Sequence, residues 1–467
     1  MPKYNPVDEK IVEELKKIVG DSYVTIDPER LENYKTDEET NPRYHHLPEA
    51  VVFPGSTQEV AQIMKLANKY LFPVTPRCGG TSLCGGTIPS HGGVVLVLER
   101  MDKIKEVNDQ SLYMVVECGA RTEDIQKAAN EKNLLYAGDP CSADSCLIGG
   151  NLATNAGGNK AVRYGTTRNQ VYSIEVVTPK GDIVTLGARL NKKTTGYCLE
   201  QLVIGSEGTL GIITGAVLKL VPLPSYRIDM LAIFTDVDKA IDIVPLVIKA
   251  GINPTSIEFM ANNAIQSTGR YCDLRLSHHD DGSYVIITVE TFSEQELEEK
   301  TVLLDELCSE NGAVEVLEAD ERVWKLRKAY SEAARSESAV NSHEDIVVPV
   351  DSIATMLKKM NEIEKQYQLQ VRTVAHAGDG NIHFIPLKMD MSDEQWEQTM
   401  DKFHEEVYTF VYSIGGRLSG EHGIGCKKID TMLDFTDPIE MAMMKDIKKA
   451  LDPNGVLNPG KIFALEY

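Results

Sequence analysis

Three glycine-dense segments in the first half of the chain restrict its fold more than any other feature. They span residues 79–93, 149–165 and 205–215. Glycines allow the backbone to approach a ligand closely and to point successive N–H groups at one anion, so such segments suit a pyrophosphate group. A single segment of this kind is more commonly a pair of tight turns. Three of them in this order favour a nucleotide-binding domain.

The first glycine segment differs from the fingerprint of nicotinamide dinucleotide domains. It reads "TPRCGGTSLCGGT" from Thr75 to Thr87, and the following "GGVVLVLERM" returns to an apolar strand. The nicotinamide fingerprint instead opens a helix. The second segment, "DPCSADSCLIGGNLATNAGGNKAVRYG", adds Asn151, Asn155 and the basic Arg163. The third, "VIGSEGTLGIITGAVLKL", predicts a strand, a turn and another strand. The sequence therefore indicates another type of nucleotide cradle.

Length, charge and cysteine content exclude several classes of protein. The 467 residues suffice for roughly two or three domains. A net charge of -22 disfavours nucleic acid and anionic membrane surfaces as partners. The N-terminus lacks the apolar core of a signal peptide and the apolar runs are too short to span a bilayer, so we expect a cytoplasmic protein without a transmembrane segment. The 9 cysteines form no C-x-x-C pair, which favours reduced thiols over disulfides or an iron-sulfur cluster.

A hairpin is predicted around "HAGDGNIHF", residues 376–384. The flanking "LQVRTVAH" and "IHFIPL" have the composition of strands, and the Asp-Gly pair between them is a turn signal. If His376 and His383 faced each other, their Cβ atoms would lie about 5 Å apart, which a metal ion can bridge. Histidines near a turn often only form hydrogen bonds, so the hairpin alone leaves both interpretations open.

The segment "RLSGEHGIG", residues 417–425, favours the metal interpretation. Glycines around Glu421 and His422 allow an irregular backbone path that directs both side chains into one cavity. Two histidines and one carboxylate form a three-ligand set with positions left open for a substrate. The alternative is a helix cap with a solvated Glu421.

These motifs, in this order, resemble the D-2-hydroxyacid dehydrogenase branch of the vanillyl-alcohol oxidase family, over residues 48–463. The branch includes D-lactate and D-2-hydroxyglutarate dehydrogenases and the flavin subunit of glycolate oxidase. The resemblance implies an α+β fold: a FAD-binding domain of two α/β subdomains over 1–221, an α/β cap with an antiparallel sheet over 222–415, and a C-terminal segment, 416–467, that returns to the FAD domain. Two long acidic helices are expected in the cap, near 293–312 and 393–413.

The resemblance implies which residues bind FAD. They lie in the glycine segments and their flanks: Pro76, Arg77, Gly79, Gly80, Thr81, Ser82, Gly85, Gly86, Pro140, Gly149, Gly150, Asn155, Gly157, Gly158 and Ile212. Cys78 stands where the family usually has glycine, which questions the local loop shape. Thr81 stands where some relatives carry a histidine that bonds the flavin covalently, so we expect dissociable FAD.

The resemblance also implies roles in the second half of the chain. His376, His383 and Glu421 would bind one divalent ion, Zn²⁺, Fe²⁺ or Mn²⁺, and His422 would be the base. Asn381 would orient the substrate. Arg327, in "VWKLRKAYSEAAR", would bind the substrate carboxylate, because a guanidinium binds it bidentately. A solvated helix arginine is the alternative for Arg327, and Arg335 is a weaker candidate for the same role.

This set of groups suits the oxidation of a 2-hydroxy acid. Carboxylate and hydroxyl can chelate the ion, which lowers the hydroxyl pKa, and His422 can take the proton while hydride passes to FAD. His343 stands where hydroxyglutarate members carry a lysine, which favours a small monoacid such as D-lactate, oxidised to pyruvate. Glycolate or D-2-hydroxyglutarate, with a quinone or another acceptor, is the alternative.

The chain has no haem motif, cluster ligands or nicotinamide fingerprint, so a partner must reoxidise the flavin. The resemblance is closest to lactate dehydrogenases of anaerobic bacteria that use an electron-transferring flavoprotein, which implies that partner. A homodimer is an open alternative to a monomer. Two other classes of protein are alternatives. A non-haem iron oxygenase would leave the glycine segments unexplained. A non-catalytic FAD-binding electron-transfer subunit would leave the predicted metal ligands without a role.

Overall fold

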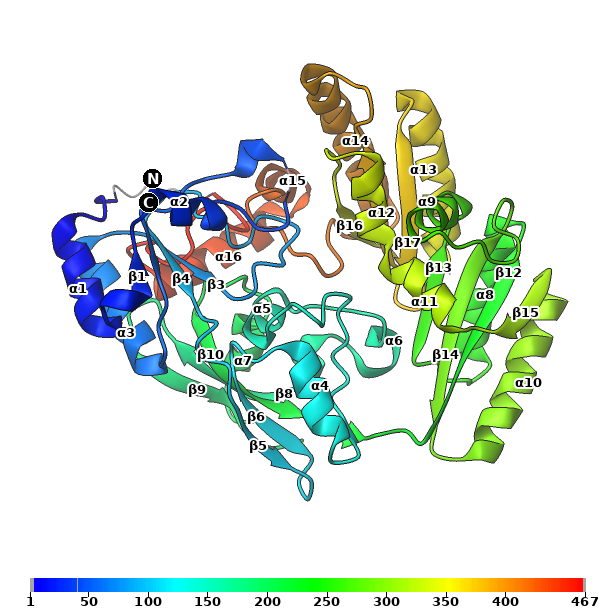
Figure 1. Ribbon diagram of the computed structural model, residues 1–467, viewed down its shortest axis with the longest axis horizontal. Helices are drawn as coiled ribbons and strands as arrows, with labels where there is room; N and C mark the ends of the chain where they lie inside the picture. The colour runs from blue at the N-terminus through cyan, green and yellow to red at the C-terminus, as the bar shows by residue number, and fades with distance from the viewer. Residues whose placement is uncertain (1–3, 40, 465–467) are drawn as a thin grey trace. The chain divides into compact units, whose positions relative to one another are not determined.

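The computed structural model describes residues 4–39 and 41–464, and its chain divides into two compact units (Figure 1). The first unit comprises the residues up to 156, residues 166–223 and the residues from 422 onward. The second comprises residues 157–165 and 224–421. The sequence had suggested boundaries at 221 and 415, and it gave no sign that residues 157–165 belong with the second unit.

The first unit contains a four-stranded sheet whose central strands are parallel. Its order is β1 (Val24–Thr25), β2 (Ala50–Val52), β4 (Val94–Val97) and β3 (Val74–Arg77), with β4 parallel to both β2 and β3. All residues of β2 and β4 are buried, as expected for parallel strands with both faces covered. Helices α1 (Glu9–Val19) and α3 (Thr57–Tyr70) pack on this sheet, and the Ser56 side chain caps the start of α3.

A second sheet of the first unit is antiparallel and five-stranded. Its order is β5 (Ile104–Asn108), β6 (Tyr113–Glu117), β10 (Ile212–Lys219), β8 (Val171–Val177) and β9 (Ile183–Gly187). Strands β7 (Leu134–Leu135) and β11 (Val221–Pro222) form a separate pair. The remaining helices of the unit are α2 (Pro28–Leu31), α4 (Thr122–Asn130), α5 (Ile148–Thr154), α7 (Leu199–Val203), α15 (Ile429–Phe435) and α16 (Pro438–Leu451).

The second unit is built on one antiparallel sheet of seven strands. Its order is β15 (Glu315–Glu318), β12 (Tyr226–Phe234), β14 (Ser283–Thr291), β13 (Ser256–Met260), β17 (Gln370–His376), β18 (Asn381–Leu387) and β16 (Glu344–Val347). Every strand pair is antiparallel. The predicted hairpin is therefore confirmed as β17 and β18, and with it the α+β class.

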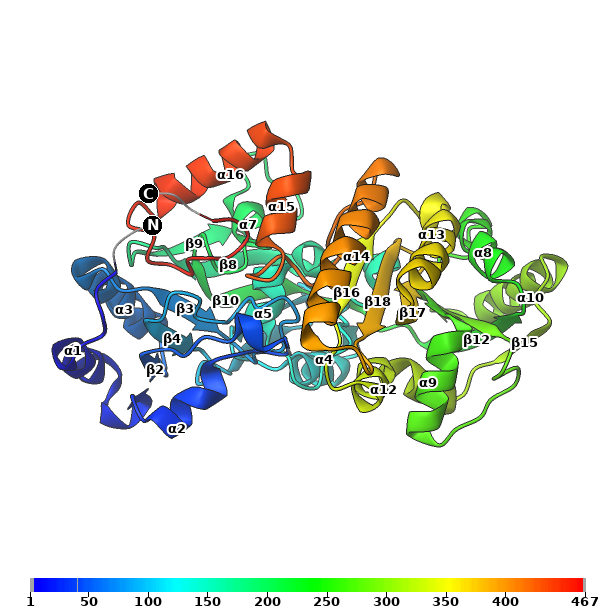
Figure 2. The same ribbon diagram turned by 90° about the horizontal axis from the view of Figure 1, so that it is seen from above.

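Helices cover both faces of this sheet (Figure 2). One face is covered by α9 (Asn262–Cys272), α11 (Glu321–Lys328) and α12 (Tyr330–Glu337). The other face is covered by α8 (Val237–Lys249), α10 (Glu294–Glu310), α13 (Ile353–Tyr367) and α14 (Asp393–Ser413). Helices α10 and α14 are the two long acidic helices expected from the sequence. The short α6 (Ala161–Tyr164) belongs to the segment 157–165.

Within the described residues, no helix combines the length and the apolar character needed to cross a membrane.

Replacing Glu364 with glutamine is expected to stabilise the second unit at pH 8 but not at pH 5. Burial raises the pKa of Glu364 on α13 from its usual 4.5 to about 7. The folded chain thus binds this proton more tightly than the unfolded chain, so the stability falls as the pH rises from 4.5 towards 7. The gain at pH 8 should be on the order of 1 kcal/mol. Thermal unfolding at both pH values measures it, and an equal shift at both would contradict the prediction.

Candidate functional site

The three predicted metal ligands converge in the second unit. The Nε2 atoms of His376 and His383 lie 3.5 and 3.3 Å from the same carboxylate oxygen, Oε1 of Glu421. The potential ligand atoms of these residues all lie within 4.8 Å of one another. Both imidazoles are buried, and their rings meet edge to face with centroids 5.2 Å apart. Burial would raise the pKa of Glu421, but the two imidazoles beside it hold that pKa well below its usual value.

The hairpin register explains how the two histidines meet. His376 lies opposite Asn381 and His383 lies opposite Val374, so the histidines are diagonal neighbours rather than directly opposed. Diagonal positions share a face of the sheet, because side chains alternate along each strand. That face is the one that α9, α11 and α12 cover, since Val374 packs in the core cluster beneath them.

The Asp-Gly turn fixes the separation of the strands at this end. Gly380 has φ +84°, and a Cβ there would lie 2.0 Å from the carbonyl oxygen of Val348. Asp379 Oδ1 accepts a hydrogen bond from the Asn381 amide at 3.2 Å. Only glycine fits the position of Gly380, so the turn holds the histidine-bearing strands in one register.

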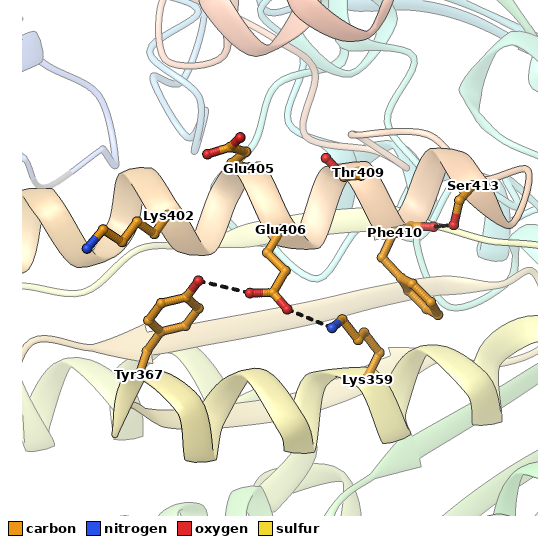
Figure 3. A pocket seen from close by; sticks show the side chains of 8 residues that line it. All are labelled: Lys359, Tyr367, Lys402, Glu405, Glu406, Thr409, Phe410 and Ser413. Carbon is orange, nitrogen blue, oxygen red and sulfur yellow. Dashed lines mark hydrogen bonds and ion pairs between the residues drawn. The ribbon is translucent and has the colours of Figure 1, made fainter.

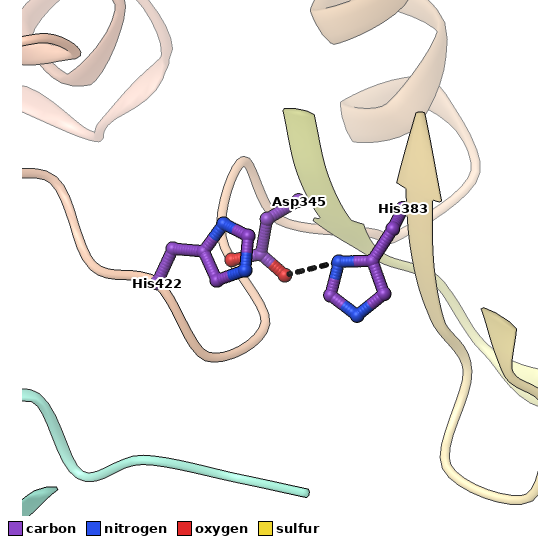
Figure 4. A group of neighbouring side chains, drawn as sticks. All are labelled: Asp345, His383 and His422. Carbon is purple, nitrogen blue, oxygen red and sulfur yellow. Dashed lines mark ion pairs between the residues drawn. The ribbon is translucent and has the colours of Figure 1, made fainter. Parts of the chain in front are cut away.

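Asp345 of β16 anchors the loop that carries Glu421, and the sequence had not suggested this residue. Its Oδ2 accepts hydrogen bonds from the Ser419 hydroxyl (2.7 Å) and from the backbone amides of Gly420 and Glu421 (3.0 Å each). Its Oδ1 lies 3.8 Å from His383 Nδ1 (Figure 4). The same oxygen accepts from Asn381 Nδ2 at 2.7 Å. Asp345 thus positions one predicted metal ligand, Glu421, through the backbone and lies beside a second, His383.

Asn381 and Arg327, expected to contact the substrate, both contact carboxylates of the chain. Asn381 Nδ2 donates to Asp345 and also to the carbonyl oxygen of Ile346 at 2.8 Å. Arg327, buried at the end of α11, donates from Nε to Oε2 of Glu258 at 2.9 Å. A solvated helix arginine is therefore the wrong description of Arg327. Their direct roles towards a substrate stay predictions.

The three-ligand set fits a divalent ion. His376 Nε2 is buried and accepts or donates no hydrogen bond among the described residues, although Glu421 lies 3.5 Å from it. Imidazole nitrogens and a carboxylate oxygen are the donor types that Zn²⁺ and Fe²⁺ use, with bonds of about 2.0–2.2 Å for zinc. Small movements of three side chains would bring their atoms to that distance from one ion.

The first unit holds most of the predicted FAD residues. Pro76 and Arg77 end β3, and the loop that leads from β3 to β4 contains Gly79, Gly80, Thr81, Ser82, Gly85 and Gly86. Ser82 Oγ closes this loop by accepting from the amides of Cys84 (3.3 Å) and Gly86 (3.1 Å). Arg77 donates to the carbonyl of Thr36 at 2.7 Å and so braces the loop from outside. The loop therefore has a defined shape of its own.

Cys78 does not disturb this loop. Its side chain is buried in the core cluster of the four-stranded sheet, with Sγ 3.9 Å from the carbonyl oxygen of Cys118. Positive φ angles occur instead at Gly80 and Gly85, +68° and +75°. The position of Cys78 therefore does not require the positive φ angle that favours glycine.

The other predicted FAD residues lie in different elements of the fold. Gly149 and Gly150 lie in the first turn of α5. A Cβ on Gly149 would lie 2.7 Å from Cys118 Cβ, so this glycine allows close packing. Pro140 lies before that helix, and Ile212 begins β10 and is buried. Asn155 ends α5 and its Oδ1 accepts from the Arg168 amide at 2.9 Å. Gly157 and Gly158 lie in the second unit, where a Cβ on Gly157 would be 2.6 Å from Glu421 Oε2.

Two buried polar atoms in the first unit could form hydrogen bonds with a bound ligand. Ser206 Oγ and Asn458 Oδ1 are buried and lack a hydrogen-bond partner among the described residues. Asn458 also donates from Nδ2 to the carbonyl oxygen of Glu207 at 2.8 Å, and a Cβ on Gly208 would lie 2.9 Å from Pro76 Cγ. Buried polar atoms are nearly always paired, so an unpaired couple beside the glycine segments fits a bound nucleotide.

Glu207 anchors the backbone that follows His422. Its carboxylate accepts from the amides of Ile424 and Gly425, at 2.7 Å each. Burial raises the pKa of Glu207, against the effect of these two amides. Cys84 Sγ donates to the carbonyl oxygen of His422 at 3.0 Å. His422 directly follows Glu421 in the chain, so the proposed base and a proposed metal ligand are covalent neighbours held by separate anchors.

A surface cavity of about 430 Å³ lies between α13 and α14 of the second unit (Figure 3). Its lining comes from those two helices: Lys359, Tyr367, Lys402, Glu405, Glu406, Thr409, Phe410 and Ser413. Glu406 accepts from Lys359 at 2.6 Å and from Tyr367 at 2.9 Å, which ties the two helices together.

Comparison with protein-family models gives two matches that together span most of the chain. Residues 48–187 match the FAD binding domain, and residues 223–462 match the C-terminal domain of FAD linked oxidases. A structure of p-cresol methylhydroxylase with substrate bound has the same fold, with a TM-score of 0.83 over 98% of both chains at 16% identity.

Curated relatives match over nearly the whole length. A D-lactate dehydrogenase of Anaerostipes hadrus is 35% identical over 98% of both chains. The glycolate oxidase subunit GlcD of Bacillus subtilis is 34% identical over 91% of both. A D-2-hydroxyglutarate dehydrogenase of Stutzerimonas stutzeri is 32% identical over 98% of this chain and 99% of its own.

Proposed function

The chain belongs to the family of FAD-linked oxidases, and on this premise we propose that it oxidises a small D-2-hydroxy acid, D-lactate above all, to the 2-oxo acid. The single observation that carries the proposal is the convergence of His376, His383 and Glu421 on one point. An ion held by this set could be chelated by the hydroxyl and carboxylate of a 2-hydroxy acid.

The proposed metal role belongs to the two histidines and Glu421. A divalent ion bound there would act as a Lewis acid on the substrate hydroxyl and carboxylate. The anchors Asp345 and Gly380 keep the ligands in place before the substrate arrives. A site held in this way loses little conformational entropy on binding.

The remaining steps are assigned to side chains of this chain. Arg327 binds the substrate carboxylate and Asn381 orients the substrate. His422 accepts the hydroxyl proton as a general base, the role that histidine most often fills in enzymes. FAD, when bound, accepts the hydride from the substrate carbon.

D-lactate is preferred over D-2-hydroxyglutarate because of His343. It stands before β16 and is buried, where a lysine would be needed for a second substrate carboxylate. The relatives named above act on three different hydroxy acids by their names, so glycolate and D-2-hydroxyglutarate remain the competing substrates.

We further propose that an electron-transferring flavoprotein reoxidises the flavin and that the protein acts in the cytoplasm. A quinone is the competing acceptor. A non-haem iron oxygenase is disfavoured because residues 48–187 match an FAD binding domain.

Anaerobic bleaching of the flavin absorbance tests the proposal. The purified protein is mixed with D-lactate, L-lactate, glycolate or D-2-hydroxyglutarate, before and after treatment with a chelator. D-lactate should bleach the flavin fastest, and the chelator should slow it. Bleaching by another acid alone would refute the substrate, and full activity in the metal-free protein would refute the metal.

Exchanging Asp345 for asparagine should weaken metal binding about 10- to 100-fold. The amide would present N–H donors where the carboxylate now accepts from the loop that carries Glu421. Competition with a coloured chelator measures the affinity. Asp351→Asn, at an exposed aspartate before α13, is the matched control and should bind metal like the parent protein. Equal affinity of both variants would contradict the anchoring role of Asp345.

A further inference from the structure

We propose that Glu258 is a positioning residue shared by the metal ligand His376 and the carboxylate-binding Arg327. The inference deepens the proposed function and rests on it. One buried carboxylate would then set the orientation of two groups of the proposed site, a metal ligand and the arginine that binds the substrate carboxylate.

Glu258 is an unusual residue for its place in the fold. It lies in β13 at the centre of the seven-stranded sheet, between Ile257 and Phe259, and is completely buried. A buried carboxylate destabilises a protein unless charged or polar partners surround it. Its carboxylate has two such partners, His376 on one oxygen and Arg327 on the other.

The contact with His376 follows from the strand register. Glu258 and His376 are direct cross-strand partners in the antiparallel pair of β13 and β17. Oε1 of Glu258 lies 2.7 Å from His376 Nδ1. A proton on Nδ1, shared with this carboxylate, leaves the lone pair on Nε2, which is the atom that faces Glu421. Such carboxylate–histidine pairs orient metal ligands and increase their basicity.

The contact with Arg327 uses the other carboxylate oxygen. Oε2 of Glu258 accepts from Arg327 Nε at 2.9 Å and lies 2.8 Å from Nη2. Two contacts fix the plane of a guanidinium, whereas one would allow it to rotate. Because α11 delivers Arg327 to the same face of the sheet, a substrate would meet an arginine already in place.

The experiment is a titration of the metal-free protein with Co²⁺, with FAD retained. Cobalt reports its affinity and its ligand geometry through visible absorption, which does not depend on turnover. Glu258→Gln should weaken Co²⁺ binding about 10- to 100-fold and alter the spectrum. It should also raise the KM for D-lactate, because the amide group would face the guanidinium with donors. Glu290→Gln is the matched control: Glu290 is a buried carboxylate of the neighbouring β14, bonded to Thr255, and its variant should bind Co²⁺ unchanged.

A second variant, Glu258→Asp, tests the inference if Glu258→Gln does not fold. Glu258→Asp keeps the charge but withdraws the carboxylate by one methylene, so it cannot keep both contacts, and it too should bind Co²⁺ more weakly than the parent protein. If Glu258→Gln or, should that variant not fold, Glu258→Asp matches the parent in affinity and spectrum, the inference is overturned.

Failure of the proposed function gives a different result. A parent protein that takes up no Co²⁺ refutes the metal centre, and the inference with it. A parent protein that binds Co²⁺ but is not reduced by D-lactate refutes the substrate only, and the affinities of the Glu258 variants still decide the inference.

Discussion

Flavin reduction by D-lactate is expected to fall by at least about 10³-fold in Glu421→Ala, with FAD still bound. Glu421 Oε1 faces both imidazoles, at 3.3 and 3.5 Å. Without it, two histidines remain, too few to hold an ion firmly at this site. The Lewis acid that should activate the hydroxyl would be lost, which removes several kcal/mol of transition-state stabilisation.

Stopped-flow absorbance under anaerobic conditions measures the reduction rate, and elemental analysis measures bound metal. Glu405→Ala, at an exposed carboxylate of α14, is the control and should keep both. A Glu421→Ala protein that is reduced by D-lactate at the parent rate would refute a role for the metal in the reaction.

Local sequence patterns predicted the parts of the fold whose residues are close in the chain. The hairpin of β17 and β18 could be predicted because its strand-forming residues and its turn signal lie within 18 residues, 370–387. The loop after β3 could be predicted from its glycines. The diagonal placement of His376 and His383 could not, since it depends on how the turn sets the strand register.

The anchoring carboxylates could not be predicted because each acts far along the chain. Glu258 meets His376 across 118 residues, Asp345 meets Glu421 across 76, and Glu207 meets Gly425 across 218. Their only local signal is a charged side chain in an apolar or glycine-rich setting, as in "SIEFM" for Glu258. A buried charged residue almost always has a partner. The local sequence therefore predicts that the carboxylate is paired, but it does not show which residue is its partner.

The same limit applies to residues 157–165. The sequence placed them with the FAD residues because of their glycines, yet they group with the second unit. Arg163 donates there to Thr255 and to the carbonyl oxygen of Glu290, at 3.0 and 2.9 Å. A segment whose neighbours lie about 90 to 130 residues away carries no local sign of its partner.

His422→Ala is expected to slow flavin reduction about 10²- to 10⁴-fold while metal and FAD stay bound. His422 is proposed to take the hydroxyl proton, and the backbone on both sides of it has separate anchors, Asp345 before it and Glu207 after it. Removing the imidazole should therefore leave the fold and the metal ligands intact. The rate is measured by stopped-flow absorbance with saturating D-lactate.

Added imidazole distinguishes a lost base from a damaged site. The space left by the side chain should admit free imidazole, so part of the rate should return in His422→Ala and none in Glu421→Ala, where the defect is a missing ligand. His46→Ala, at an exposed histidine of the first unit, is the control and should behave as the parent protein. A His422→Ala protein that has lost its metal and does not respond to imidazole would assign His422 to the metal site instead of proton transfer.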